Sequence, residues 1–156
     1  MAKLSAGILL YRLTKGFPEV MLIHPGGPFW ANKDEGAWSI PKGEPGENED
    51  LRETAIRELQ EETGIIASGE LLELAPIRQK AGKTVYCWAL EQDADVTNIA
   101  GNHFELEWPP GSGKLKSFPE ADKAEWFDIP AARKKILAGQ LPLLEELETK
   151  LNKNSG

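Results

Sequence analysis

The sequence predicts an α+β fold in which helices pack against both faces of a β-sheet. Two observations support this prediction. Short stretches rich in β-formers lie on both sides of one acidic helix, and two more helical stretches follow near the C-terminus. Such elements bury their apolar sides by forming layers. With 156 residues, the chain fits one domain over residues 1–156 and can bury a real core.

Two strands are expected first, at residues 5–13 and 19–24, because a turn separates two stretches rich in β-formers. His24 ends the second strand. It could act as a general base, but it lies far in sequence from the acidic helix. A structural role is therefore favoured.

Residues 25–30 form a loop, because Pro and Gly dominate them. The loop carries Phe29 and Trp30. Aromatic side chains can stack on a nucleobase, at about 1–3 kcal/mol per base, or they can plug the end of a core. Both interpretations stay open, and Trp30 is a candidate substrate contact.

The central helix has clear end signals. Asp50 is the expected N-cap, and Glu53 three residues later completes a capping-box pattern. Gly64 is the expected stop, because glycine takes the left-handed conformation without strain. Apolar residues at helical spacing predict a buried face between these ends. They are Leu51, Ala55, Ile56 and Leu59.

Further elements follow from β-former content and periodicity. The expected strands are residues 71–79, 83–91, 104–108 and 124–128, and the expected helices are residues 130–138 and 143–151. Residues 109–119 are rich in breakers and carry Lys114 and Lys116, which favours a mobile substrate flap. The last helix has a leucine stripe that indicates core or dimer contact.

Three acids on the central helix predict a metal site. Glu58, Glu61 and Glu62 have the spacing i, i+3 and i+4, so they repel one another by roughly 0.2–0.5 kcal/mol per pair. They also oppose the helix dipole, at about 0.3–1 kcal/mol each, although Arg57 can pair with Glu61 or Glu53. Oxygen ligands favour Mg²⁺ or Mn²⁺ over zinc. The alternative is a solvated charged face.

The same stretch carries a longer pattern. Gly43 is followed after five residues by Glu49, and after seven more by residues 57–65, RELQEETGI. This pattern resembles the Nudix box, with every fixed position present. The resemblance implies the Nudix hydrolase family, which has a mixed β-sheet between α-helices and cleaves nucleoside diphosphates linked to another moiety.

The resemblance also implies Mg²⁺ bound by carboxylates of the box helix, and by a backbone carbonyl just before the box glycine. The implied ligands are Glu58, Glu62, Glu61 and the carbonyl of Lys42. Glu49 and Arg57 are expected to brace these ligands by pairing with them.

A further carboxylate must take the proton of the attacking water. Glu61 is one candidate. Glu120 is the other, because it lies six residues before Trp126, and members of the family often place a late catalytic glutamate ahead of a strand tryptophan. Glu120 is favoured, since Glu61 is expected to be engaged by Arg57 or by a second metal.

Residues 38–43, WSIPKG, resemble the family branch that acts on dinucleoside polyphosphates more than the branch that sanitises oxidised dGTP. The Lys42 side chain could meet phosphate as a point charge. Arg78, Lys80 and Lys83 form a basic cluster that either contacts phosphates or solubilises a turn. These cations favour dinucleoside polyphosphates or nucleoside triphosphates over sugar nucleotides.

Composition restricts partners and compartment. A net charge of −7 disfavours nonspecific binding to nucleic-acid backbones, so a small nucleotide is the expected partner and no long nucleic acid is expected. The lone Cys87 excludes an intrachain disulfide and indicates a reducing compartment. Neither a membrane span nor a signal-peptide pattern is found. We expect a cytoplasmic monomer or homodimer.

Two alternative functions remain. A catalytically silent Nudix fold would serve as a nucleotide-sensing or protein-binding module, but the complete set of box acids argues against it. A 5′-end RNA pyrophosphohydrolase would have a polymeric partner. The acidic balance argues against a long RNA track, although a single 5′-triphosphate needs only a local pocket.

Overall fold

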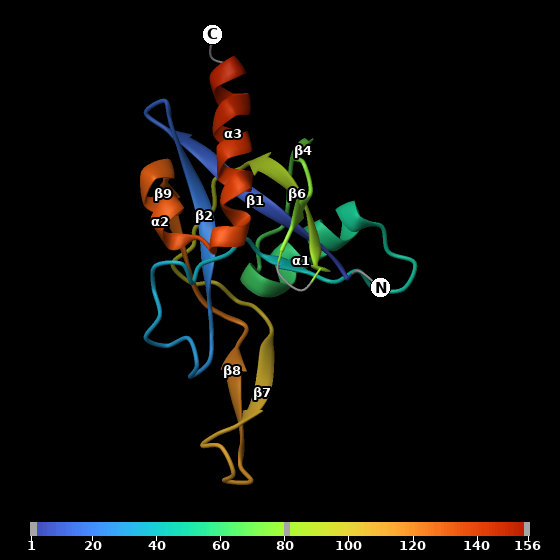
Figure 1. The fold of residues 1–156 in the computed structure, drawn as a ribbon, viewed down its shortest axis with the longest axis vertical. Coiled ribbons are helices and arrows are strands. Elements are labelled where there is room, and N and C mark those ends of the chain that lie inside the picture. Colours follow the sequence, from blue (N-terminus) through green and yellow to red (C-terminus); the bar gives the residue numbers. More distant parts are fainter. Residues whose placement is uncertain (1–2, 80–81, 155–156) are drawn as a thin grey trace.

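A computed structural model describes residues 3–79 and 82–154 of the chain. Within these residues, seven strands form one sheet. Their bounds are Leu4–Thr14 for β1, Phe17–Pro25 for β2, Lys42–Gly43 for β3, Leu71–Glu73 for β4, Ile77–Arg78 for β5, Thr84–Glu91 for β6 and Ala121–Asp128 for β9. The order across the sheet is β4–β6–β1–β2–β9 (Figure 1). In addition, β3 pairs with β1 and β5 pairs with β6.

The sheet is mixed, which confirms the prediction. β1 runs parallel to β6 along its length and antiparallel to β2 and β3. β2 in turn pairs antiparallel with β9. The β1–β2 connection turns at Lys15 and Gly16, which both have positive φ, and such turns match the twist of hairpin strands.

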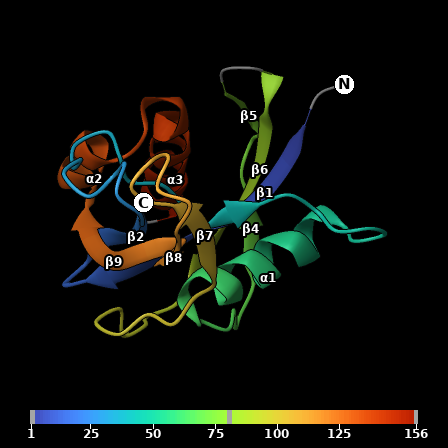
Figure 2. The same ribbon diagram turned by 90° about the horizontal axis from the view of Figure 1, so that it is seen from below.

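Helices cover both faces of the sheet, as predicted (Figure 2). Helix α1, Leu51–Thr63, packs against one face through a buried cluster that includes Ala55 and Leu59. Helices α2, Ile129–Lys135, and α3, Leu141–Asn154, pack against the other face in a second cluster. Among the described residues, no helix is long and apolar enough to cross a bilayer.

Both predicted ends of α1 are confirmed. The Glu53 N–H donates to Asp50 Oδ1 at 2.8 Å, so Asp50 is the N-cap. Gly64 has a φ of 81°, and its N–H donates to the Gln60 carbonyl at 2.7 Å. Because the helix ends at Gly64, its last turn carries the predicted acids to the edge of β3.

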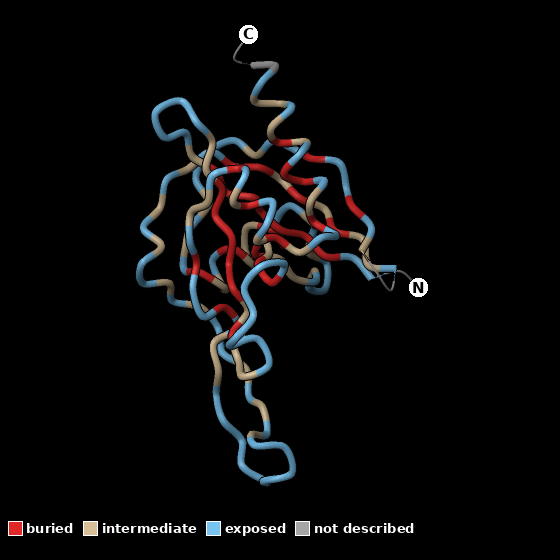
Figure 3. The backbone as a smooth tube through the Cα atoms, turned by 60° about the vertical axis from the view of Figure 1, so that its left-hand side comes forward, coloured by how far each residue is buried: buried red, intermediate tan, exposed pale blue. Residues whose placement is uncertain are grey.

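The loop predicted for residues 109–119 is partly wrong, because residues 115–119 form a strand. Strands β7, His103–Glu107, and β8, Leu115–Pro119, pair antiparallel. They form a hairpin that projects from the body of the protein and is mostly exposed (Figure 3). Apart from Pro119, the breakers occupy its turn, where Gly111 and Gly113 have positive φ. Pro119 is tolerated because it ends the strand.

Other boundaries also differ from prediction. The expected strand 71–79 is split into β4 and β5, because Pro76 has no N–H to donate. The expected strand 124–128 begins earlier, at Ala121, and α3 begins earlier than residue 143. The leucine stripe of α3 belongs to the core. Its fully buried members are Leu143, Leu144 and Leu147.

Candidate active site

The C-terminal half of α1 carries the three predicted acids. Two of these acids, Glu58 and Glu61, form ion pairs with Arg57. Glu58 is the more buried of the two, with 12% of its side chain exposed, whereas the Glu61 side chain is 37% exposed. Glu62 lines a cleft beside β3. Residues three and four apart share one face of a helix, so helix geometry alone accounts for this grouping.

Arg57 ties the acidic side chains together. Its Nε and Nη2 donate to the two carboxylate oxygens of Glu49 at 2.8 and 2.9 Å, which is the strong two-point geometry. Its Nη1 donates to Glu61 at 2.8 Å and to Glu58 at 3.1 Å. The guanidinium holds the pKa of Glu49 down at about 2. Of the two helical partners predicted for Arg57, the structure shows Glu61.

Strand β3 lies directly against the same acids. A Cβ on Gly43 would lie 2.2 Å from Glu58 Cδ, so only glycine lets the strand approach this carboxylate. The Lys42 N–H donates to Glu62 Oε2 at 3.2 Å. Lys42 and Gly43 are held in place because both pair with β1.

Burial makes these acids costly to ionise. It raises the pKa of Glu62 to about 8, and repulsion from Glu58 and Glu120 adds to the shift. Burial also raises the pKa of Glu58, against the opposing charge of Arg57. A cation beside both carboxylates would favour their charged forms.

The donor set fits a hard divalent cation by its chemistry. It consists of partly buried carboxylates that repel one another, and oxygen donors suit Mg²⁺ or Mn²⁺. Within residues 3–79 and 82–154, no three Asp, Glu, His or Cys side chains converge closely enough to hold an ion as they stand. Arg57 instead engages Glu58 and Glu61, and the Lys42 N–H engages Glu62.

Glu120 reaches this region through a chain of backbone hydrogen bonds. The Asn102 N–H donates to the Glu61 carbonyl at 2.7 Å, and the Glu120 N–H donates to the Asn102 carbonyl at 2.9 Å. The Gly26 N–H then donates to the Glu120 carbonyl at 3.0 Å. Glu120 therefore lies between the end of α1 and the loop after β2, although it is distant from both in sequence.

A cleft of about 220 Å³ brings several predicted residues together. Trp30, Ala37 and Leu137 supply apolar lining, and Lys42, Glu62 and Glu120 supply charged groups. Trp30 is 40% exposed. Phe29 instead packs its ring edge-on against Trp108, with 5.5 Å between ring centroids. Of the two predicted aromatic residues, Trp30 is therefore the one that lines the cleft.

The predicted basic residues are only partly brought together. Burial lowers the pKa of Lys42, and repulsion from Lys83 lowers it further. Arg78 is exposed on β5 and is not among the described residues that line the cleft. Lys80 lies outside the described residues. Lys42 is thus the cation placed directly at the cleft.

Ala37 and Leu137 line the cleft but were not predicted as site residues. The Trp38 N–H donates to the Lys135 carbonyl at 3.0 Å, and the Leu137 N–H donates to the Trp38 carbonyl at 2.8 Å. These bonds join the end of α2 to the segment before β3. No local pattern signals a contact between segments so far apart in the chain.

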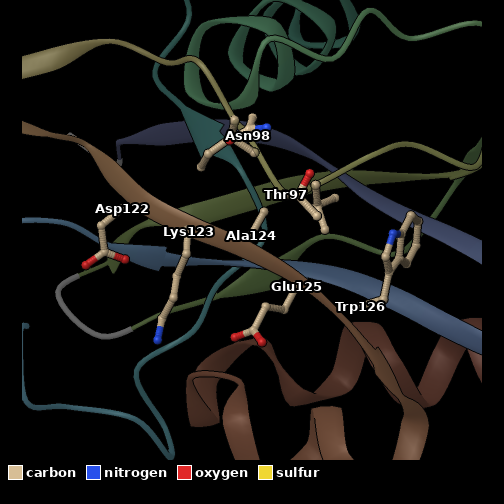
Figure 4. A pocket seen from close by; sticks show the side chains of 9 residues that line it. Thr97, Asn98, Asp122, Lys123, Ala124, Glu125 and Trp126 are labelled. Carbon is tan, nitrogen blue, oxygen red and sulfur yellow. The ribbon is translucent and has the colours of Figure 1, made fainter.

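A larger groove, of about 690 Å³, lies along β9. Figure 4 shows Lys123, Glu125 and Trp126 of β9, with Thr97 and Asn98 from the segment before β7. Among the described residues, the groove shares no lining residue with the smaller cleft. Of the predicted acids, Glu62 and Glu120 line the smaller cleft together with Lys42, whereas the larger groove, in the described part of the chain, holds none of the predicted site residues.

The chain is similar to proteins of one family. The model of the NUDIX domain matches residues 1–147. A Rattus norvegicus protein, bis(5′-nucleosyl)-tetraphosphatase [asymmetrical], is 46% identical over 81 residues, which cover 46% of this chain and 54% of the rat protein. Nudix hydrolase 7 of Arabidopsis thaliana is 29% identical over 114 residues, which cover 68% of this chain and 38% of that protein. The chain thus spans about half, or less, of the length of these relatives.

Solved structures share the fold. A C. elegans Ap4A hydrolase binary complex has a TM-score of 0.67 at 23% identity, with 97% of this chain and 99% of that chain covered. The NUDIX domain of Shewanella oneidensis NrtR, complexed with ADP ribose, has a TM-score of 0.69 at 19% identity, with 97% and 89% covered. At these identities the likeness establishes the architecture.

Proposed function

The chain belongs to the NUDIX domain family, and from this premise we propose that it hydrolyses pyrophosphate linkages in nucleoside polyphosphates with Mg²⁺, or with Mn²⁺ as a substitute. The observation that carries the proposal is the cleft, where Glu62 and Glu120 lie with Lys42 and Trp30. One cleft thus brings together carboxylates for metal binding and proton transfer, an ammonium group for phosphate and an aromatic ring for a nucleobase.

Dinucleoside polyphosphates and nucleoside triphosphates are the proposed substrates. The name of the rat relative supports this choice, as does the C. elegans structure of an Ap4A hydrolase. Lys42 also supplies a positive charge at the cleft, and the charge of Lys83 acts on it. Positive charges of this kind suit a substrate with several phosphate groups better than a sugar nucleotide.

The proposed metal ligands are Glu58, Glu62, Glu61 and the backbone carbonyl of Lys42. When bound, Mg²⁺ neutralises phosphate oxygens and activates the attacking water. Arg57 braces these ligands, because it bonds Glu49 on one side and Glu58 and Glu61 on the other.

Glu120 is the proposed general base. It lines the cleft, and its charge acts on both Glu58 and Glu62. Glu61 is instead engaged by Arg57 at 2.8 Å, and it is not among the described residues that line the cleft. Glu120 takes the proton from water as the water oxygen attacks phosphorus, and the bridging P–O bond breaks to release the second phosphate product.

A substrate panel tests the proposal. We expect kcat/KM with Mg²⁺ to be highest for diadenosine tetraphosphate or a nucleoside triphosphate, among substrates that include ADP-ribose and 5′-triphosphorylated RNA. A clear preference for ADP-ribose contradicts the choice of substrate. A preference for RNA favours a 5′-end RNA pyrophosphohydrolase, and no turnover of any substrate by folded protein contradicts hydrolysis altogether.

Nucleotide sensing without turnover is the second candidate. One observation favours it: NrtR, whose NUDIX domain shares this fold, has structures complexed with ADP ribose and with a 27mer DNA. Tight nucleotide binding by calorimetry, together with no hydrolysis in the presence of Mg²⁺ or Mn²⁺, would support this candidate.

A further inference from the structure

His24 is a buried histidine that makes two hydrogen bonds to different segments. It is 2% exposed. Its Nδ1 lies 2.9 Å from Asp122 Oδ1 at the start of β9, and its Nε2 lies 2.7 Å from the Lys33 carbonyl oxygen in the loop after β2. Since a backbone carbonyl only accepts, Nε2 carries a proton and donates to Lys33.

The Lys33 contact fixes the turn that carries Trp30. The Lys33 N–H donates to the Trp30 carbonyl at 3.0 Å, and the Trp30 N–H donates to the Gly27 carbonyl at 3.3 Å. Trp30 and Lys33 therefore belong to one hydrogen-bonded turn. Holding the Lys33 carbonyl holds this turn, and with it the aromatic lining of the cleft.

The Asp122 contact lies on β9, two residues after Glu120, which itself lines the cleft. This segment already meets the loop, because the Gly26 N–H donates to the Glu120 carbonyl at 3.0 Å. The approach is close: a Cβ on Gly26 would lie 1.9 Å from the Pro119 carbonyl oxygen. His24 thus joins the loop with Trp30 to the strand that follows Glu120.

We propose that His24 is a positioning residue that holds Trp30 at the cleft for the nucleoside part of the substrate. This role rests on the proposed function and acts through the Lys33 carbonyl. His24 itself does not touch the reacting atoms, because it is buried and both of its ring nitrogens are occupied. An ordinary buried histidine would stabilise the fold without any specific link to Trp30.

Two substitutions separate these roles. The amide nitrogen of Gln corresponds to Nε2 and that of Asn to Nδ1, so His24→Gln keeps the Lys33 contact while His24→Asn loses it. We expect His24→Asn to raise KM about tenfold, as loss of one buried hydrogen bond does, with kcat changed less than about threefold. His24→Gln should keep KM within about threefold of the wild type.

A double-mutant cycle with Trp30→Ala tests the link directly. If His24 acts through Trp30, His24→Asn raises KM by less than about twofold in the Trp30→Ala background. The same tenfold rise in both backgrounds contradicts the proposal. His103→Asn is the matched control, because His103 is the other histidine of the chain and is exposed on β7.

Amide hydrogen exchange without substrate tests, independently of catalysis, whether His24 holds the loop that carries Trp30. We expect His24→Asn to speed exchange at residues 26–37 and to leave β1 and β6 as in the wild type. Faster exchange throughout the protein, or no change in exchange at residues 26–37, contradicts the proposal that His24 holds this loop. If His24→Asn does not fold, a tenfold rise of KM in folded His24→Gln overturns the proposal. If wild-type protein hydrolyses no nucleotide, the proposed function fails, whereas the exchange result still decides whether His24 clamps the loop.

Discussion

The Cα of Gly43 faces the carboxylate of Glu58 with no space between them for a side chain. A Cβ on Gly43 would lie 2.2 Å from both Glu58 Cδ and Glu58 Oε1. The strand before the box helix and a proposed metal ligand on that helix are thus packed against each other, and the position of one determines the position of the other.

Gly43→Ala should therefore displace Glu58 and lower kcat/KM by about 100-fold, the effect of misplacing a catalytic group by about 1 Å. Steady-state kinetics with diadenosine tetraphosphate measures this. Gly46→Ala is the matched control, because a Cβ on Gly46 would meet Glu49 Oε1 at an ordinary 3.7 Å. Equal activity of the two variants would show that the Gly43–Glu58 contact has no functional role.

Glu62→Gln should stabilise the metal-free protein at neutral pH. The folded state raises the pKa of Glu62 from 4.5 to about 8. A raised pKa means that ionising Glu62 lowers stability as pH rises from about 4.5 through 8. We expect the gain in unfolding free energy to be small at pH 4.5 and to exceed about 1 kcal/mol at pH 8, given about 1.4 kcal/mol per pKa unit. Urea unfolding in EDTA at several pH values measures it, and a constant difference would contradict the burial of this charge.

Glu120→Gln should lower kcat strongly and leave metal affinity nearly unchanged, because a base that does not hold the metal adds little to metal binding. Glu61→Gln should reduce kcat less and should weaken metal binding. Kinetics at saturating substrate, together with Mn²⁺ titration, distinguishes the two. Near-wild-type kcat for Glu120→Gln would assign the base to Glu61.

Arg57→Lys should reduce both activity and stability, because lysine cannot make the two-point contact with Glu49. We expect kcat to fall about tenfold, as for residues that orient metal ligands. Arg57 lowers the pKa of Glu49 to about 2, so this pair stabilises the fold above about pH 4.5, and the contribution is lost as pH falls through 2. The difference in urea midpoint between the wild type and Arg57→Lys should therefore narrow as pH falls from about 4.5 to 2. Arg52→Lys, at an exposed position of the same helix, is the control.

Much of the fold could be predicted because its signals are local. Asp50, Glu53 and Gly64 mark the ends of α1 in the sequence, and the structure confirms each by a hydrogen bond or a dihedral angle. The β7–β8 hairpin was missed in part, because glycines in its turn made the whole of residues 109–119 resemble a loop. Whether such a segment pairs with a neighbour depends on contacts that its own composition does not encode.

The site divides in the same way. Helical spacing groups Glu58, Glu61 and Glu62, and this follows from the sequence alone. The position of Glu120 near the end of α1 depends on backbone hydrogen bonds through Asn102 and Gly26. Such bonds do not depend on which side chains these residues carry. Long-range backbone pairing of this kind leaves no residue pattern, so only the family resemblance pointed to Glu120.

Turnover of diadenosine tetraphosphate by the wild type and by Glu62→Gln, each with Mg²⁺ and with EDTA, tests the central claim most directly. We predict hydrolysis by the wild type with Mg²⁺, its loss in EDTA, and its recovery on addition of Mn²⁺. Glu62→Gln should reduce turnover by orders of magnitude, because it removes a charged ligand while keeping the side-chain shape. Undiminished turnover in EDTA, or wild-type turnover by Glu62→Gln, would contradict a metal-dependent mechanism at this cleft.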